Sequence, residues 1–327
     1  MNSFGRNLRI SIFGESHGEK IGLILDGIPA GISLSSDDFL KDLARRSGGK
    51  SGTTPRIEKD IPEIVSGVYK GFTTGAPIGI LFSNDNTRSS DYLNFADIPR
   101  PGHADFVSLI KSGGYVDLRG GGHHSGRITL TLVAAGVVAK KILGKILVKA
   151  DLINVGGVED TEDWELLLQK TREEGDSLGG IIECTVTNMP VGLGEPFFDS
   201  LESLLSHIIF AIPGVRGIEF GDGFAAASMR GSEHNDPIVD SRGKTSKNGA
   251  GGINGGISNG NDLLFKVAVK PTSSISKSQQ TLNFVTGNIE ELKIEGRHDT
   301  CFALRVPVVV EAATAIVLAD LILSSTL

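Results

Sequence analysis

The feature that most constrains the fold is a long apolar segment at residues 128–148. Leu130, Leu132, Val133 and Ala135 place apolar side chains on several faces of a helix there, and the first charged residue is Lys140. A helix that is apolar nearly all round belongs in a core rather than on a surface. The pattern therefore predicts a buried helix over residues 128–148, which is the longest helical pattern of the chain.

The apolar periodicity of the rest of the chain predicts strands and helices in alternation. A final apolar helix is expected at residues 308–323, with Glu311 inside it and Pro307 suited to its first turn. Shorter helices are expected at residues 35–46, 104–111, around 164–168 and 201–211. Strands are expected at residues 8–13, 21–25, 64–69, 78–82, 150–155, 181–186, 217–220 and 263–269. The β/α/β order suggests one domain over residues 1–327 with two similar halves, about 1–149 and 150–327.

Cations in the loops of an acidic chain suggest a small anionic ligand. The chain has 327 residues and a formal net charge of -7, which argues against a general nucleic-acid binder. Several basic residues nevertheless fall in or beside loops rich in glycine and turn residues: Arg45, Arg46, Lys50, Arg56, Arg119, Arg127, Lys270 and Arg297. Such cations can bind phosphate or carboxylate groups.

The sequence carries no sign of export or of a membrane span. Cys184 and Cys301 lie far apart and give neither a disulfide framework nor a metal-binding spacing. The N-terminus has no basic stretch followed by an apolar one, and no run of about 18 uncharged apolar residues occurs. We therefore expect a cytoplasmic protein.

A polar turn at residues 14–18 is a candidate catalytic element. It reads Gly14-Glu15-Ser16-His17-Gly18 and lies between two expected strands. An imidazole beside a hydroxyl and a carboxylate is suited to acid–base chemistry. The pattern also matches the nucleophile elbow of serine hydrolases, but that elbow requires a helix after the turn, and the next segment is β-like.

Two glycine-rich segments resemble nucleotide-binding motifs but lack their spacing. Residues 47–56 contain Gly49-Lys50-Ser51, yet Ala44 occupies the first glycine position of a P-loop. In the segment before residue 128, Ser125 occupies the third glycine position of a dinucleotide fingerprint. The start of the expected helix there, with its glycines and Arg127, remains a candidate anion site. His103, His123 and His124 have no carboxylate at a supporting spacing, so we expect no metal site.

Five motifs follow one another in an order that resembles a known family. They are Gly14-Glu15-Ser16-His17-Gly18 through Asp26-Gly27-Ile28-Pro29, Arg100-Pro101-Gly102-His103-Ala104-Asp105, residues 120–127, residues 270–274, and Gly296-Arg297-His298-Asp299 through Glu311. Together they resemble chorismate synthase, and the resemblance covers essentially the whole chain.

The resemblance implies a fold, a reaction and a cofactor. The fold is α+β, a β-α-β sandwich in which helices lie between antiparallel sheets, assembled as a homotetramer. The reaction is a 1,4-anti elimination of phosphate from 5-enolpyruvylshikimate 3-phosphate to give chorismate, in the shikimate pathway of aromatic amino-acid biosynthesis. The cofactor is reduced FMN, required without net redox change. Because no dinucleotide fingerprint is present, we expect an external flavin reductase or reductant rather than NADP-dependent reduction by the chain itself.

The resemblance also implies roles for individual residues. His17 resembles the proton donor to the departing phosphate, and His103 resembles the histidine that protonates or holds the reduced flavin. Asp299 resembles the carboxylate that helps the flavin take up the ring proton. Substrate-binding positions are Ser16, Arg46 and Arg127. Flavin-binding positions are His123, His124, Ser125, Pro213, Gly214, Gly255, Lys270, Pro271, Thr272, Ser273, Ser274 and Arg297.

Two departures from the family pattern concern basic residues. Many members have arginine where this chain has His123, so we expect that contact to be weaker or pH-dependent. Ser47 stands where proline is common, and Ser51 stands where a further arginine is common. Lys50 and Arg56 are the candidates to replace that arginine.

Two alternatives to a chorismate synthase activity are a binding protein and a different enzyme. The first is a non-catalytic homologue that binds FMN or a phosphate ligand, against which the presence of His17, His103 and Asp299 weighs. The second, more distant, is a serine hydrolase built on Ser16.

Overall fold

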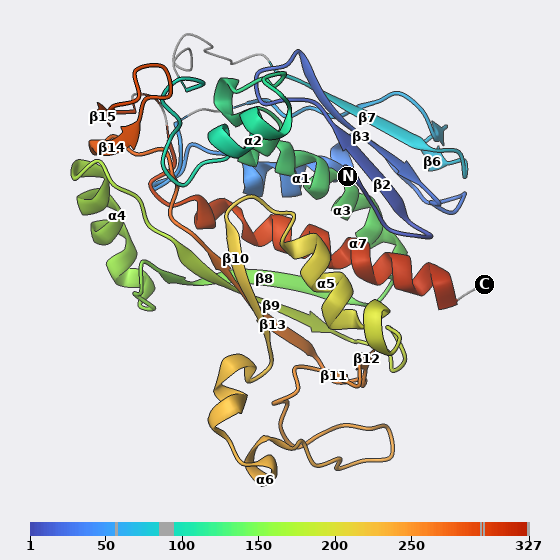
Figure 1. Ribbon diagram of the computed structural model, residues 1–327. Coiled ribbons are helices and arrows are strands. Elements are labelled where there is room, and N and C mark those ends of the chain that lie inside the picture. Colours follow the sequence, from blue (N-terminus) through green and yellow to red (C-terminus); the bar gives the residue numbers. More distant parts are fainter. Residues whose placement is uncertain (56–57, 85–94, 295, 297, 326–327) are drawn as a thin grey trace.

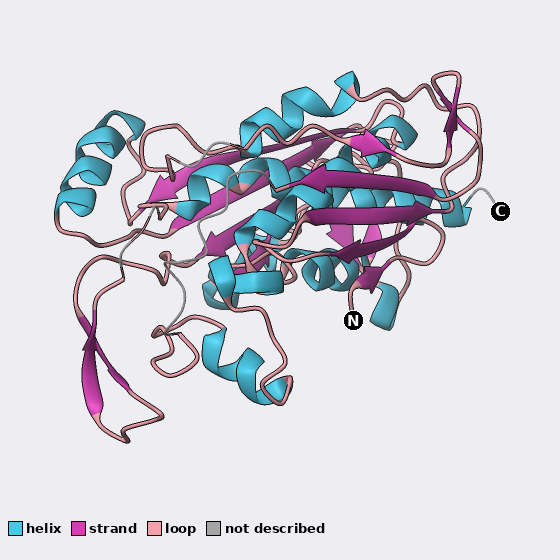
Figure 2. Ribbon diagram, turned by 90° about the horizontal axis from the view of Figure 1, so that it is seen from above, coloured by secondary structure: helices cyan, strands magenta, loops and turns pink. Residues whose placement is uncertain are grey.

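Two antiparallel sheets enclose a layer of helices (Figures 1 and 2). The computed structural model describes residues 1–55, 58–84, 95–294, 296 and 298–325. One sheet has the strand order β1-β2-β3-β7-β4 and the other has the order β10-β13-β9-β8. Neighbouring strands in both sheets are antiparallel. This arrangement confirms the expected α+β sandwich.

The first sheet comes from the N-terminal part of the chain. Its strands are β1 (Ser3–Phe4), β2 (Arg9–Phe13), β3 (Lys20–Asp26), β4 (Glu63–Ile64) and β7 (Ile78–Ser83). A separate hairpin consists of β5 (Val68–Tyr69) and β6 (Phe72–Thr73). The helices of this part are α1 (Asp37–Arg46), α2 (Asp105–Lys111) and α3 (Thr129–Ile142).

The second sheet comes from the C-terminal part. Its strands are β8 (Leu147–Val155), β9 (Gly180–Thr187), β10 (Val215–Phe220) and β13 (Leu263–Val269). Two hairpins lie outside it, β11 (Ile253–Asn254) with β12 (Ile257–Ser258), and β14 (Gln279–Leu282) with β15 (Ile289–Leu292). The helices are α4 (Trp164–Glu173), α5 (Leu201–Ile209), α6 (Gly231–His234) and α7 (Pro307–Ser325).

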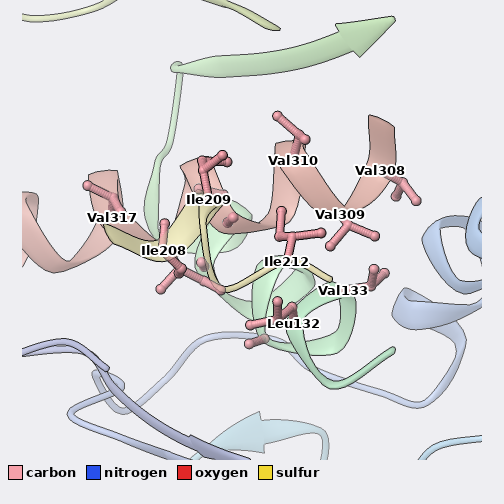
Figure 3. Close-up of a cluster of buried hydrophobic side chains, with 14 of the residues drawn as sticks. Leu132, Val133, Ile208, Ile209, Ile212, Val308, Val309, Val310 and Val317 are labelled. Atoms are coloured by element: carbon pink, nitrogen blue, oxygen red, sulfur yellow. The ribbon is translucent and has the colours of Figure 1, made fainter. Parts of the chain in front are cut away.

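Helices α3 and α7 form the centre of the helical layer. They pack against each other, and α1 and α5 pack beside them. Figure 3 shows apolar side chains of this layer in one cluster: Leu132 and Val133 of α3, Ile208, Ile209 and Ile212 in and after α5, and Val308, Val309, Val310 and Val317 of α7. Side chains on β9 and β13 alternate between buried and less buried, as expected for sheets with one face on the core.

The expected helix over residues 128–148 is wrong at its C-terminal end. Helix α3 ends at Ile142, and Val148 lies in strand β8, paired with Val186. Gly144 ends the helical path because its φ of +63° lies in the left-handed region. The longest helix is therefore α7, which has 19 residues against 14 for α3.

Other predicted boundaries also change. The expected strand at residues 64–69 is two short strands, β4 and β5, separated at Gly67, which has a φ of +79°. The hairpin of β14 and β15 was not expected, because its residues are mostly polar. The other expected strands and helices are present, with ends that shift by a few residues.

Helix α7 is long and apolar enough to cross a membrane, but its packing explains that composition. Within its most apolar window, Pro307–Ser324, 72% of the residues are buried inside the protein. Its two acidic residues are also bonded: Glu311 pairs with Arg45, and Asp320 accepts bonds from backbone N–H groups near the N-terminus. Such a helix is the expected core of a sandwich.

Candidate active site

A cavity of about 780 Å³ is lined by segments from both sheets and from the helical layer. Cavities of roughly 300–1,000 Å³ are typical of small-molecule and cofactor sites. Most of the candidate site residues line it: Ser16, Arg46, His103, His123, His124, Ser125, Arg127, Pro213, Gly214, Lys270, Pro271, Thr272, Ser273, Ser274 and Asp299. The fold thus brings together motifs that are up to about 280 residues apart in the sequence (16 to 299).

Three candidate residues are placed differently. His17 is buried behind Gly120 rather than on the cavity wall of the described chain. Gly255 lies in the turn between β11 and β12, which Figure 1 shows beyond the second sheet, and it does not line the described cavity. Arg297, like Arg56, lies outside the described residues.

The turn at residues 14–18 is held by the glycine loop before α3. The N–H of Ser16 donates to the carbonyl of Gly122 at 3.0 Å. Gly120 has a φ of +61°, and a Cβ atom there would lie 2.6 Å from His17 Cδ2 and 2.8 Å from Ser16 Oγ. Glycine is therefore required for the loop to approach the turn so closely.

His103 is fixed by a buried carboxylate. Its Nδ1 atom lies 2.6 Å from Asp105 Oδ1, and Arg100 Nε and Nη2 each donate to Asp105 at 2.7 Å. Burial raises the pKa of Asp105, but its hydrogen bonds to Arg100 and His103 outweigh this effect and hold it well below the usual range. An ionised carboxylate only accepts hydrogen bonds, so Nδ1 of His103 carries a proton and Nε2 is left for a ligand.

Arg46 and Arg127 share one buried carboxylate. Arg46 Nη2 donates to Asp60 Oδ2 at 3.0 Å, and Arg127 Nη1 donates to Asp60 Oδ1. Burial raises the pKa of Asp60, yet the two arginine charges keep it below its ordinary value. Burial, followed by the nearby charge of Arg305, lowers the pKa of Arg46 to about 10, so Arg46 stays protonated at neutral pH.

The two arginines retain buried donors beyond these bonds. Within the described part of the chain, Arg46 Nε, Arg46 Nη1 and Arg127 Nη2 have no hydrogen-bond partner. Both residues line the cavity. Buried polar groups in folded proteins are nearly always hydrogen-bonded, so these donors are a candidate site for an anion.

Asp299 is held from two sides. It accepts from the backbone N–H of Thr54 at 2.8 Å, and Arg305 Nη1 donates to both of its oxygens at 3.2 and 3.1 Å. Arg305 Nε also donates to the carbonyl of Arg46 at 2.8 Å. Arg305 therefore links the carboxylate to the end of α1, where Arg46 lies.

The segment after β13 presents a cation and hydroxyl groups. Lys270 Nζ donates to Gly102 O at 2.6 Å and lies 2.8 Å from Ser273 Oγ. Ser274 Oγ accepts from Arg100 Nη1 at 3.0 Å. Burial, and then the charge of Arg216, lowers the pKa of Lys270. Thr272 Oγ1 is buried and has no partner among the residues that the structure describes.

The adjacent histidines before α3 differ in their contacts. His123 Nδ1 lies 2.8 Å from the carbonyl of Gly14, and its Nε2 lies 3.2 Å from Asn2 Oδ1. His123 thus anchors the polar turn. Burial, and then the charges of His123 and His103, lowers the pKa of His124.

Several residues that complete the site were not assigned a role from the sequence. Arg100 and Asp105 belong to the motif that contains His103, and their spacing was a signal that could have identified them. Asp60 and Asn84 lie outside the five motifs, and Arg305 lies within the last one but received no role, because their partners become neighbours only when the chain folds.

The family model, two relatives and one solved structure that resemble this chain are all described as chorismate synthase. The matching family model is that of chorismate synthase and spans residues 8–323. A chorismate synthase of Chitinophaga pinensis is 60% identical over 324 residues, covering 99% of this chain and 97% of the relative. One of Dehalococcoides mccartyi is 46% identical over 351 residues, covering 98% and 96%. A solved structure described as "Crystal Structure of Chorismate Synthase" has a TM-score of 0.77 at 29% identity, covering 98% of this chain and 93% of that one. The chain belongs to the chorismate synthase family.

Proposed function

We propose that the chain carries out the reaction of its family in this cavity. It eliminates phosphate from 5-enolpyruvylshikimate 3-phosphate and gives chorismate, with reduced FMN as cofactor. The observation that carries the proposal is the pair of buried arginines, Arg46 and Arg127, whose remaining donors have no partner among the described residues. The substrate carries one phosphate and two carboxylates, the groups that guanidinium binds best.

The energetic argument favours an anion over a neutral ligand. A buried donor without a partner costs about 1–3 kcal/mol. Among the described residues, three such donors lie on two cationic side chains that share one carboxylate, Asp60. An anionic group satisfies these donors and offsets the net positive charge of the cluster at the same time.

The remaining lining suits a flavin. Apolar side chains including Ile10, Ile12 and Leu132 form part of the wall, and Thr272 supplies a buried hydroxyl without a described partner. Lys270 and the hydroxyl groups that follow it fit the phosphate of FMN. When bound, reduced FMN supplies electron density to the allylic carbon–oxygen bond as the phosphate leaves.

The acid–base groups have distinct tasks in this proposal. His17 is assigned the proton for the departing phosphate, although its ring lies behind Gly120 and only its neighbour Ser16 lines the cavity. His103 donates or accepts a hydrogen bond through Nε2, because its Nδ1–H is bonded to Asp105. Asp299, oriented by Arg305 and Thr54, takes part in removing the ring proton.

The assembly and setting belong to the same proposal. The chain acts in the cytoplasm as a homotetramer and receives reducing equivalents from an external reductase or reductant. Light scattering should give a mass four times the 34.5 kDa of one chain. A monomer at working concentration would contradict this part.

The substitution Arg46→Ala tests the site assignment. It removes two of the buried donors, so KM for the enolpyruvyl substrate should rise roughly 10- to 100-fold. Steady-state turnover with reduced FMN measures the change. The matched control is Arg45→Ala, because Arg45 precedes Arg46 on α1 and pairs with Glu311 at 2.7 Å, off the cavity lining. Equal KM values in the two variants would remove the anion site from the account.

A further inference from the structure

We infer that Asp60 is a positioning residue for the anion site. It holds Arg46 and Arg127 side by side, with their remaining donors directed to the cavity. The inference deepens the proposed function and rests on it, since it concerns how the anionic groups of the substrate are received. Asp60 does not line the cavity and so acts through the two arginines.

The first support is that the two arginines share the carboxylate of Asp60. Each oxygen of Asp60 accepts from a terminal nitrogen of one guanidinium. The side chains of all three residues are at most 5% exposed. Two buried guanidinium groups repel each other strongly, so a shared carboxylate is what allows them to lie together.

The second support is the identity of the donors that remain. Asn84 Oδ1 accepts from Arg127 Nε at 3.1 Å, and Asp60 engages Nη1, so Nη2 is the nitrogen of Arg127 that has no partner among the described residues. On Arg46, Asp60 engages Nη2 and leaves Nε and Nη1 within the described chain. The carboxylate therefore selects which nitrogens face the anion.

The third support is the backbone at Asp60. Its φ of +45° lies in the left-handed region, which residues other than glycine adopt at a cost. Such conformations persist only where the surroundings over-determine them, and they are concentrated at functional sites. Asp60 therefore occupies a conformation that its two ion pairs help to maintain.

A role for Asp60 as a simple counter-ion predicts the opposite change in anion affinity. If Asp60 were only a counter-ion that competes with the substrate, its removal would make the cavity more positive and would tighten anion binding. If Asp60 positions the arginines, its removal loosens their geometry and weakens binding. The sign of the change in affinity separates the two roles.

The test compares Asp60→Asn with Glu311→Gln. Asparagine has nearly the same size and tolerates the left-handed region, so Asp60→Asn changes mainly the charge and one acceptor. Glu311 is also a buried carboxylate between two cations, Arg45 and Lys140, but it does not line the cavity. Both variants should lose thermal stability.

Binding of inorganic phosphate to the flavin-free protein, measured by calorimetry, is the first readout. Asp60→Asn should raise the Kd about tenfold, and Glu311→Gln should leave it unchanged. In turnover, KM for the substrate should rise in Asp60→Asn while kcat changes by less than about threefold. Unchanged or tighter phosphate binding in Asp60→Asn would overturn the inference.

The outcomes also separate this inference from the proposed function. A wild-type protein that binds phosphate but forms no chorismate would contradict the proposed function, and the phosphate measurement would still decide the role of Asp60. If Asp60→Asn does not fold, Asp60→Glu keeps the charge but displaces the carboxylate by one methylene. It should also weaken phosphate binding, and a wild-type Kd in that variant would contradict the positioning role.

Discussion

At the scale of single residues, the imidazole of His103 shows how a buried ion pair sets the chemistry of a side chain. Asp105 is 1% exposed, and burial raises its pKa, but three hydrogen bonds from Arg100 and one from His103 hold that pKa low enough for it to be a carboxylate at neutral pH. That carboxylate binds the Nδ1 proton of His103 and thereby fixes both the tautomer and the ring orientation. Nε2 is then the ring nitrogen that this carboxylate leaves for a ligand.

The substitution Asp105→Asn should lower kcat about 100-fold with little change in KM for the substrate. The amide no longer fixes the Nδ1–H tautomer, and it leaves Arg100 without its ionic partner. Anaerobic turnover at several pH values measures the effect. Ser108→Ala is the control, because Ser108 is a buried residue of the same helix that bonds Ala104 and does not line the cavity. A wild-type kcat and pH profile in Asp105→Asn would show that His103 does not depend on this carboxylate.

Single residues also show where prediction from sequence ends. The motifs identified His103, Arg127 and Asp299 as site residues, and the fold places each of them on one cavity. They could not identify Asp60, which lies 14 residues after Arg46 in a polar segment without periodicity. Nor could they identify Asn84, whose contact with Arg127 spans 43 residues. Such partners are defined by tertiary contact alone.

At the scale of elements, the crossing of α3 and α7 determines the centre of the molecule. A Cβ atom at Gly136 would lie 2.3 Å from the Cβ of Ala312, closer than real Cβ contacts. Glycine costs about 1 kcal/mol in a helix interior relative to alanine. The close approach of the two helices therefore explains a residue that local propensity disfavours.

The substitution Gly136→Ala should lower the free energy of unfolding by about 1–3 kcal/mol, because the two helices must move apart. Denaturant unfolding measures the loss. Gly231→Ala is the matched control: Gly231 begins α6, and a Cβ there meets nothing within 4 Å. Its free energy of unfolding should change by less than about 0.5 kcal/mol. Equal stability of the two variants would show that the crossing tolerates a methyl group.

Elements were predictable where apolar periodicity was strong. The strands at Lys20–Asp26 and Leu263–Val269 and the helix Asp37–Arg46 follow their patterns closely. The predicted C-terminal end of α3 was wrong because the apolar pattern continues across Gly144 into a strand. A buried strand and a buried helix have the same apolar composition, so periodicity alone does not separate them. The β14–β15 hairpin has few apolar residues and gave no periodic signal.

At the scale of the whole molecule, the two sheets contribute different parts of one site. The N-terminal part supplies Arg46, His103 and Arg127, and the C-terminal part supplies Lys270 and Asp299. The last helix also holds the N-terminal segment, because Asp320 accepts from the backbone N–H groups of residues 6–8 at 2.6–3.1 Å. The first four residues of that segment line the cavity.

The arrangement of the whole was expected from the family resemblance rather than from periodicity. The alternation of strands and helices was visible in the sequence, but the pairing of β13 between β9 and β10 joins strands about 45 and 80 residues apart. Loop lengths and apolar patterns do not specify such pairings uniquely. The sequence motifs pointed to one family fold, and in the structure most of the candidate residues from these motifs line one cavity.

The most direct test of the central claim is an anaerobic turnover assay with the purified chain, chemically reduced FMN and 5-enolpyruvylshikimate 3-phosphate. Chorismate absorbance and phosphate release are followed together, with oxidised FMN as the control. The account predicts equal amounts of chorismate and phosphate, and only when the flavin is reduced. Flavin binding without either product would contradict it and would favour a non-catalytic homologue that binds FMN.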